Sequence, residues 1–281
     1  MGGKKIFDQT KPVFIISMIL LIIGAVVVAV PFLWMLLTSF KTYEESTSIN
    51  PYIIFPEKIR FNAYLTVTNT YNFGRLYFNT ITLIVLRIFF GVLTSCMAGY
   101  AFARLKFLGK SFFFSLVLIQ MMVPGQIFVL PQYLMIVKLK ALNTMFALLF
   151  PGFITTFGTF LMRQFFKSLP SSLDESAKID GANPLQIFSF IMIPLVNSGM
   201  VALGIFTALF AYKELLWPLV VNTANYAMPL SSALAKLQGQ SITYFPDLMA
   251  AATLASIPMI IVYIIFQKWF IQGIATTGLK F

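Results

Sequence analysis

The hydrophobic residues fall into long apolar runs, which are separated by shorter polar connectors. A helix needs about 20 mainly apolar residues to cross a bilayer, and six runs approach that length. They are Val13–Leu37, Thr80–Ala103, Phe112–Val137, Phe146–Leu161, Ile191–Tyr212 and Leu248–Phe270, of which the fourth is the shortest. The pattern predicts an all-α integral membrane protein with six transmembrane helices, folded as a single transmembrane domain over residues 1–281.

The composition supports lipid as the main solvent of this chain. Of its 281 residues 59% are hydrophobic and 10% are charged, whereas soluble domains carry about a quarter charged residues. That leaves too little polar surface to cover a globule in water. The first apolar run is too long for the core of a signal peptide, so we expect it to be retained as the first span.

The basic residues set the expected orientation. The net charge is +11, and most Lys and Arg residues stand at the ends of apolar runs, where they orient spans or meet anionic headgroups rather than nucleic acid. With the N-terminus inside the cell, the inner connectors hold eleven basic residues and the longer outer connectors hold seven. The bias predicts cytoplasmic N- and C-termini.

Several chemistries are excluded by missing residue types. The chain has no histidine and a single cysteine, Cys96, which removes His-based zinc sites and Ser-His or Cys-His nucleophiles. The stretch "LGKS" at residues 108–111 resembles the end of a phosphate-binding loop, but Arg104 occupies the position of the required glycine. We therefore predict no catalytic residue, no metal site and no cofactor in this chain.

The segment from residue 168 to residue 195, "SLPSSLDESAKIDGANPLQIFSFIMIPL", concentrates acidic residues between two apolar runs. Ser172 and Glu175 have the spacing of a capping box, and Gly181 can end the resulting helix in a left-handed conformation. Asn183 and Gln186 form a second box, which predicts a second helix. We interpret the segment as a rigid knob with a small surface; a solvated loop with helical character is the alternative.

The same segment resembles the EAA motif of permease subunits in binding-protein-dependent ABC importers. The matching residues are Glu175, Ser176, Ala177, Asp180, Gly181, Ala182, Phe188, Pro194 and Leu195, with Ser176 in place of the usual second alanine. Other stretches are similar to maltose-type carbohydrate permeases, among them "PFLWMLLTSFK", "AGYAFARLKFLGK" and "VPGQIFVLPQYL". The fifth span departs from that family, because it ends in "FAYKELLWPLVV" instead of a stretch containing Trp-Asn.

This resemblance implies a type I ABC importer permease in the bacterial cell membrane. The knob would be the coupling helix, which docks on a separate ATPase through Glu175, Ser176, Ala177, Asp180, Gly181 and Ala182. That ATPase would bind the ATP and Mg. The other implied partners are a second permease in a heterodimer, a second ATPase copy, an extracytoplasmic solute-binding protein and a carbohydrate.

Polar residues within or near the spans are candidates for the translocation path. They are Arg87, Gln126, Tyr212, Lys213, Glu214 and Trp217. A charge within a span favours a functional role, but Arg87 lies near enough to an end to snorkel. Lys213 and Glu214 can likewise line the path or anchor the span at the interface. Both interpretations stay open for these residues.

Two other classes of function compete with an importer subunit. A secondary transporter driven by an ion gradient commonly has carboxylates at mid-membrane and repeated halves. Here the carboxylates lie outside the predicted spans or near their ends, and we find no internal repeat. A membrane enzyme ranks third, because no nucleophile-base pair or metal cluster can be assembled.

Overall fold

The computed structural model describes residues 10–49, 51–239 and 244–278. Within these ranges the regular elements are helices, apart from one isolated bridge between Ile49 and Tyr52, so the all-α prediction is confirmed. The chain forms two compact units. Unit 1 holds the described parts of residues 1–70 and 237–257, and unit 2 holds those of residues 71–236 and 258–281. The single transmembrane domain stays a prediction.

Unit 1 begins with a long exposed helix, α1 (Thr10–Thr38), whose side chains are exposed from Val13 to Leu33. An apolar stretch of this length that is exposed on all sides fits a lipid environment. The connector that follows is held at Lys41, whose Nζ lies 4.2 Å from the centroid of the Trp34 ring and donates to the Ile53 carbonyl at 2.7 Å. It also contains α2 (Tyr43–Thr47) and α3 (Asn62–Thr70).

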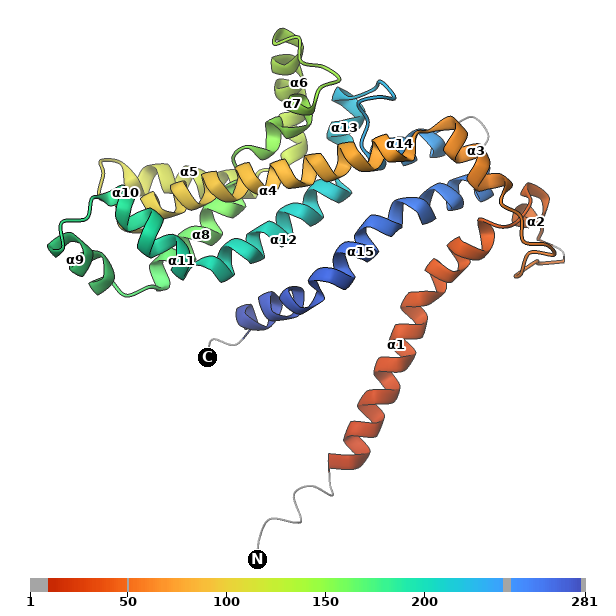
Figure 1. Ribbon diagram of the computed structural model, residues 1–281, viewed down its shortest axis with the longest axis horizontal. Coiled ribbons are helices and arrows are strands. Elements are labelled where there is room, and N and C mark those ends of the chain that lie inside the picture. Colours follow the sequence, from red (N-terminus) through yellow and green to blue (C-terminus); the bar gives the residue numbers. More distant parts are fainter. Residues whose placement is uncertain (1–9, 50, 240–243, 279–281) are drawn as a thin grey trace, which may run out of the picture. The chain divides into compact units, whose positions relative to one another are not determined.

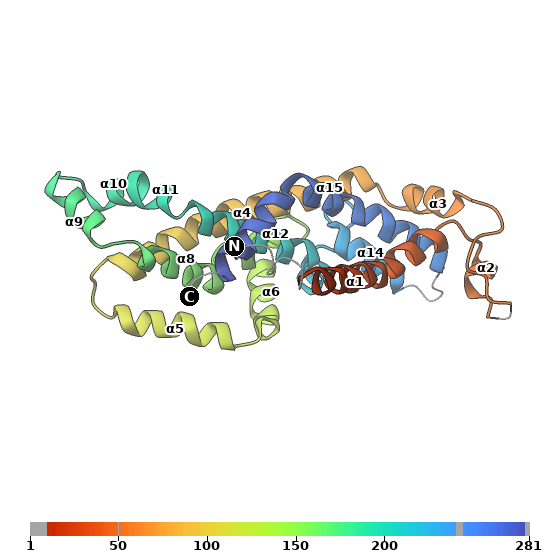
Figure 2. The ribbon, with the colours of Figure 1, turned by 90° about the horizontal axis from the view of Figure 1, so that it is seen from below.

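Unit 2 is built around α4 (Phe73–Arg104), which packs along α8 (Thr156–Ser168) and α12 (Asn197–Lys213), as Figures 1 and 2 show. Two glycines let α4 and α8 approach closely. A Cβ at Gly99 would lie 2.8 Å from the Cβ of Met162, and one at Gly158 would lie 2.2 Å from the Oγ of Ser95. Neither position therefore tolerates a side chain without a shift of one helix.

The remaining helices of unit 2 are short or belong to bent pairs. They are α5 (Lys110–Met122), η1 (Gly125–Phe128), α6 (Val129–Lys138), α7 (Met145–Leu149), η2 (Phe150–Gly152), α9 (Ser172–Ile179), α10 (Pro184–Gln186), the π-helix η3 (Ile187–Met192), α11 (Ile193–Leu195) and α13 (Leu216–Val221). Two further helices, α14 (Leu230–Gln238) and α15 (Phe245–Gly278), cross the boundary between the units.

Three of the six predicted spans are single long helices. The run Val13–Leu37 lies in α1, Thr80–Ala103 lies in α4, and Leu248–Phe270 lies in α15. In the described part of the chain three helices are long and apolar enough to cross a membrane, or up to six if each bent pair counts as one span. Helix α4 starts before the predicted boundary because Asn72 accepts from the backbone N–H of Arg75 as an N-cap.

The other three predicted spans are bent pairs and not single helices. Phe112–Val137 is divided between α5 and α6 with a bend of 101°, and Pro124 and Gly125 stand at the break. Phe146–Leu161 is bent by 48° after Pro151 and Gly152, and its second helix, α8, continues to Ser168. Val123, before Pro124, is extended, as a residue before proline favours, whereas the extended residue at the second break is Thr155.

The run Ile191–Tyr212 is likewise not one helix. The segment Pro184–Leu195 meets α12 at an angle of 76°, and α12 begins only at Asn197. The break lies two residues after Pro194, at Val196, whose backbone has φ −99° and ψ 16°. The apolar pattern did not reveal this bend because the polar stretch after it, residues 197–199, is short and apolar residues follow it.

Candidate functional site

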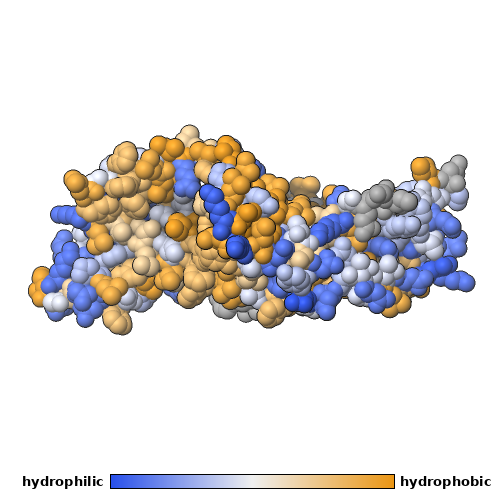
Figure 3. Space-filling model, turned by 90° about the horizontal axis from the view of Figure 1, so that it is seen from above, coloured by the Kyte–Doolittle hydropathy of each residue, from blue (hydrophilic) through white to orange (hydrophobic). Residues whose placement is uncertain are grey.

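The loop of residues 168–195, here called the acidic loop, lies at one end of unit 2 (Figure 1). Figure 3 shows mainly hydrophilic residues at that end and hydrophobic residues over the neighbouring part of the same face. The loop nevertheless presents three exposed apolar side chains, Ile179, Leu185 and Phe190. Exposed apolar groups within a polar surface are typical of a protein contact.

The turn of the acidic loop has a defined backbone. Gly181 has φ +81°, the left-handed conformation that the sequence predicted. The N–H of Ala182 donates to the Ala177 carbonyl at 2.9 Å, and that of Gly181 donates to the Lys178 carbonyl at 3.1 Å. These two hydrogen bonds make a Schellman motif, which ends α9 sharply.

One of the two predicted capping boxes is present. Asn183 and Gln186 exchange hydrogen bonds of 2.8 and 2.9 Å between side chain and backbone, with Pro184 at the first helical position. The box predicted for Ser172 and Glu175 is wrong, because α9 already begins at Ser172 and its cap, Ser171, makes no side-chain hydrogen bond. Ser171 has helical backbone angles, so its hydroxyl does not reach the amides it would cap.

Most of the residues assigned to ATPase docking are on the surface of this loop. Glu175, Ser176, Asp180 and Gly181 are exposed, Ala182 is half-buried, and Ala177 is buried. A shallow groove runs beside the turn, lined by Asp180, Gly181, Ala182, Gln186, Phe190 and Ile191. The loop thus offers polar groups, a slim turn and apolar groups on one surface.

An ion pair that the sequence did not reveal attaches this loop to the helices behind it. The Nη1 of Arg104 lies 3.1 Å from a carboxylate oxygen of Asp174, and both side chains are largely buried. The Nη2 of Arg104 also donates to the carbonyls of Phe166 at 2.7 Å and Leu169 at 2.6 Å, at the end of α8. One guanidinium therefore joins α4, α8 and α9.

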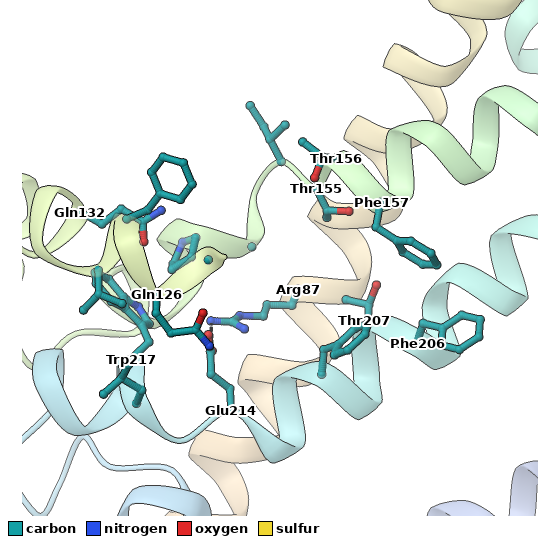
Figure 4. A pocket seen from close by; sticks show the side chains of 18 of the residues that line it. Arg87, Gln126, Gln132, Thr155, Thr156, Phe157, Phe206, Thr207, Glu214 and Trp217 are labelled. Carbon is teal, nitrogen blue, oxygen red and sulfur yellow. Dashed lines mark ion pairs between the residues drawn. The ribbon is translucent and has the colours of Figure 1, made fainter. Parts of the chain in front are cut away.

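A second candidate site is a cavity of about 580 Å³ in unit 2, shown in Figure 4. It is enclosed by the end of α5, the break before α6, the loop before α8, one side of α12 and the start of α13. Four of the six path candidates, Arg87, Gln126, Glu214 and Trp217, line it. The proline breaks that interrupt the predicted spans are what open this space.

Arg87 and Glu214 meet in the cavity wall. Their Nη2 and Oε2 atoms are 2.6 Å apart, and the side chains are 8% and 27% exposed. Arg87 also donates to the Leu148 carbonyl, and it fits because a Cβ at Gly152 would come within 3.0 Å of it. The Arg87 side chain is therefore paired inside unit 2, and the roles of Arg87 and Glu214 in the path stay predictions.

The cavity also contains groups that the sequence analysis did not select. They are the amides of Gln120 and Gln132 and the hydroxyls of Thr155, Thr156 and Thr207. No periodic signal marks these residues, which come together only because the chain bends. Trp217 is buried, and its Nε1 donates to the Ala147 carbonyl at 2.8 Å. Tyr212 and Lys213 are not among the lining residues, and Lys213 is exposed.

Comparisons with known proteins were made for the whole chain. Residues 91–276 match the family described as "Binding-protein-dependent transport system inner membrane component". The chain is 32% identical over 258 residues to the arabinooligosaccharides transport system permease protein AraQ of Halalkalibacterium halodurans, covering 91% of this chain and 92% of that protein. It is 29% identical over 278 residues to the sn-glycerol-3-phosphate transport system permease protein UgpE of Brucella suis, covering 96% and 99%.

The fold also matches a solved structure. The crystal structure of a bacterial ABC transporter involved in the import of the acidic polysaccharide alginate contains a chain that aligns with a TM-score of 0.74 at 27% identity. The alignment covers 94% of this chain and 98% of that one. The overall fold is therefore shared with a chain of nearly equal length.

Proposed function

This chain belongs to the family of binding-protein-dependent transport system inner membrane components, and from this premise we propose that it is the permease subunit of an ATP-driven importer of carbohydrate. As a member of the family it is a multi-pass protein of the bacterial inner membrane and a non-catalytic component. Relatives named for arabinooligosaccharides and diacetylchitobiose support a carbohydrate as the solute.

The acidic loop is proposed to be the docking element for the ATPase. The observation that carries this proposal is the exposed left-handed turn at Gly181, which stands between a Schellman motif and a capping box. Such a turn is rigid and slim, so a cleft on another protein can close around it. Glu175 and Asp180 would face basic groups or backbone donors there, and Ile179 would bury its exposed side chain.

The proposed mechanism converts docking into alternating access. ATP binding would draw two ATPase subunits together and carry the acidic loops of two permeases with them as rigid bodies. The path would then open outward to the loaded solute-binding protein, and hydrolysis would return it inward. The ATP and Mg would be bound by the ATPase chains, and a second, similar permease would complete a heterodimer.

The topology and the path follow from the same assignment. Each bent pair would count as one span, which gives six spans, and the bias of basic residues places both termini in the cytoplasm. The cavity around Gln126 and Trp217 would form part of the translocation path. A secondary transporter driven by an ion gradient is not favoured, because the known family members are components of binding-protein-dependent systems.

The test is ATP hydrolysis by the complex purified through this subunit and placed in lipid vesicles. We expect an ATPase to co-purify and its activity to rise only when a solute-loaded binding protein is added. Comparing candidate oligosaccharides in the binding protein would identify the solute in the same assay. Absence of a co-purified ATPase, together with uptake that follows an imposed ion gradient, would refute the proposal.

A further inference from the structure

The cavity holds two charged side chains whose charges cancel. Of the described residues that line it, only Arg87 and Glu214 are ionisable at neutral pH as an acid or a base, and they form one ion pair. The other polar lining groups are amides and hydroxyls, which carry no charge. A solute that enters therefore meets a polar but electrically neutral lining.

The two partners of the ion pair are not equally available to a solute. Arg87 is the more buried side chain, and its Nη2 group already faces both Glu214 and the Leu148 carbonyl. Glu214 is about three times as exposed, at 27% against 8%. An anionic group in the cavity would therefore meet the Glu214 carboxylate, while the Nη2 group of Arg87 behind it is already occupied. Such an unfavourable contact with one class of ligand is a known means of specificity.

The rest of the lining suits a ligand rich in hydroxyl groups. Gln120, Gln126 and Gln132 can each donate and accept hydrogen bonds. The Thr155 hydroxyl accepts from the Gly158 N–H and can still donate, and the Thr207 hydroxyl donates to the Leu203 carbonyl and can still accept. Phenylalanine rings at positions 128, 157, 206 and 210 supply apolar faces between these groups. Figure 4 shows Gln126 beside the ion pair, with Thr155 and Thr207 on neighbouring elements.

We propose that this cavity accepts uncharged, hydroxyl-rich solutes and rejects acidic ones, and that Glu214 determines this choice by neutralising Arg87 and repelling anions. The inference rests on the proposed function, since it assumes that the solute passes this cavity. It goes further by fixing the charge of the solute and by giving Glu214 a role in specificity.

The experiment measures solute binding to the complex in nanodiscs. The binding protein is left out, so that only binding to the permease contributes to the signal. Saturation-transfer NMR registers weak ligands, and it would be recorded with a mixture of neutral oligosaccharides and with the same mixture after its primary hydroxyls are oxidised to carboxylates. The wild type should give signals chiefly from the neutral mixture. Glu214→Gln should raise the ratio of oxidised to neutral signal about tenfold, as expected when an unpaired guanidinium gains one charge-assisted hydrogen bond.

Two further variants separate charge from structural damage. The double change Arg87→Gln with Glu214→Gln restores a neutral lining and should return the preference to neutral solutes. Glu57→Gln removes the same charge from an exposed position outside the cavity and should behave as the wild type.

Equal signals from both mixtures in the wild type, no signal from the neutral mixture, or an unchanged ratio in Glu214→Gln would each overturn the inference. Failure of the proposed function would be recognised separately, because no ATPase would co-purify with this subunit.

Discussion

The ion pair between Arg104 and Asp174 gives the sharpest prediction about how the acidic loop is held. Asp174→Asn keeps the shape of the side chain but removes its charge, which leaves the guanidinium with its two carbonyl acceptors at Phe166 and Leu169. Arg104→Met removes all three contacts while it preserves much of the apolar stem. Lys178→Gln, on the same helix and exposed, is the matched control.

The magnitude follows from burial. Both side chains are about 90% buried, at 11% and 12% exposure, and removing one member of a buried pair costs about 3–5 kcal/mol. Asp174→Asn should cost an amount near the lower value, because the arginine keeps its carbonyl partners. Arg104→Met should cost an amount near the upper value. Lys178→Gln should stay within about 0.5 kcal/mol, as is usual for a surface position.

The loss of stability is expected to be confined to the acidic loop. The assay is therefore hydrogen exchange of the α9 backbone amides. If the acidic loop opens without unfolding the rest of unit 2, about 3 kcal/mol corresponds to roughly a hundredfold loss of protection. The same complexes would be tested for ATP hydrolysis and for uptake into vesicles. If the acidic loop no longer moves together with α4 and α8, less solute should be transported per ATP hydrolysed while the ATPase remains bound.

Two results would refute this reasoning. Unchanged protection of α9 in both Asp174→Asn and Arg104→Met would mean that the ion pair does not hold the loop. Loss of protection with unchanged transport per ATP would mean that the attachment is structural only. The charge exchange Arg104→Asp with Asp174→Arg is a further check, which should recover part of the protection if the pair itself matters.

Four other predictions concern single positions. In Gly181→Leu the new side chain meets open space, but the backbone at φ +81° is strained by about 1–2 kcal/mol. The protein should insert normally and lose ATP-driven uptake. Normal uptake would contradict docking at this turn. Glu175→Lys should reduce the amount of ATPase retained on the purified complex, and unchanged retention would limit this carboxylate to a local role. Gly99→Leu should lower the thermal stability of the complex, because its Cβ alone would lie 2.8 Å from Met162; a wild-type melting temperature would contradict the close packing of α4 and α8. The pKa of Glu45 is lowered, chiefly by the N–H of Thr42. The stability that ionised Glu45 contributes is therefore present above its unfolded pKa near 4.5 and is lost as pH falls through the lower folded pKa. Amide exchange at Thr42, corrected for its intrinsic rate, should show this loss in the wild type and not in Glu45→Gln.

The sequence predicted features whose causes are local. The left-handed turn at Gly181 and the box of Asn183 with Gln186 depend on residues within a few positions of each other, and both are present. The box assigned to Ser172 is wrong, because α9 begins one position earlier than the box requires and Ser171 makes no side-chain hydrogen bond. Helix ends commonly vary by this amount.

The bends and the ion pairs could not be predicted in the same way. Pro124 and Pro151 were visible, but hydropathy is continuous across both breaks, and length alone favoured unbroken spans. Arg87 pairs with Glu214, and Arg104 pairs with Asp174, across separations at which a sequence pattern carries no pairing information. For Arg87 the sequence states two alternatives, and the structure adds that its side chain packs against Gly152 and pairs with Glu214.

Both ion pairs involve α4, and this gives the helix a mechanical role that neither pair has alone. Arg104 joins its end to the acidic loop, and Arg87 joins it to the cavity wall. The two residues are 17 positions apart, about 25 Å at 1.5 Å per residue, and α4 runs between them as one helix without an internal proline. An unbroken helix transmits displacement along its axis more directly than a bent one. A movement imposed on the acidic loop would therefore reach the guanidinium that Glu214 holds. Because that contact is a short ion pair in a partly buried wall, a shift of about 1 Å is enough to change what Glu214 faces. The charge lining of the cavity and the position of the acidic loop are thus expected to change together, through α4.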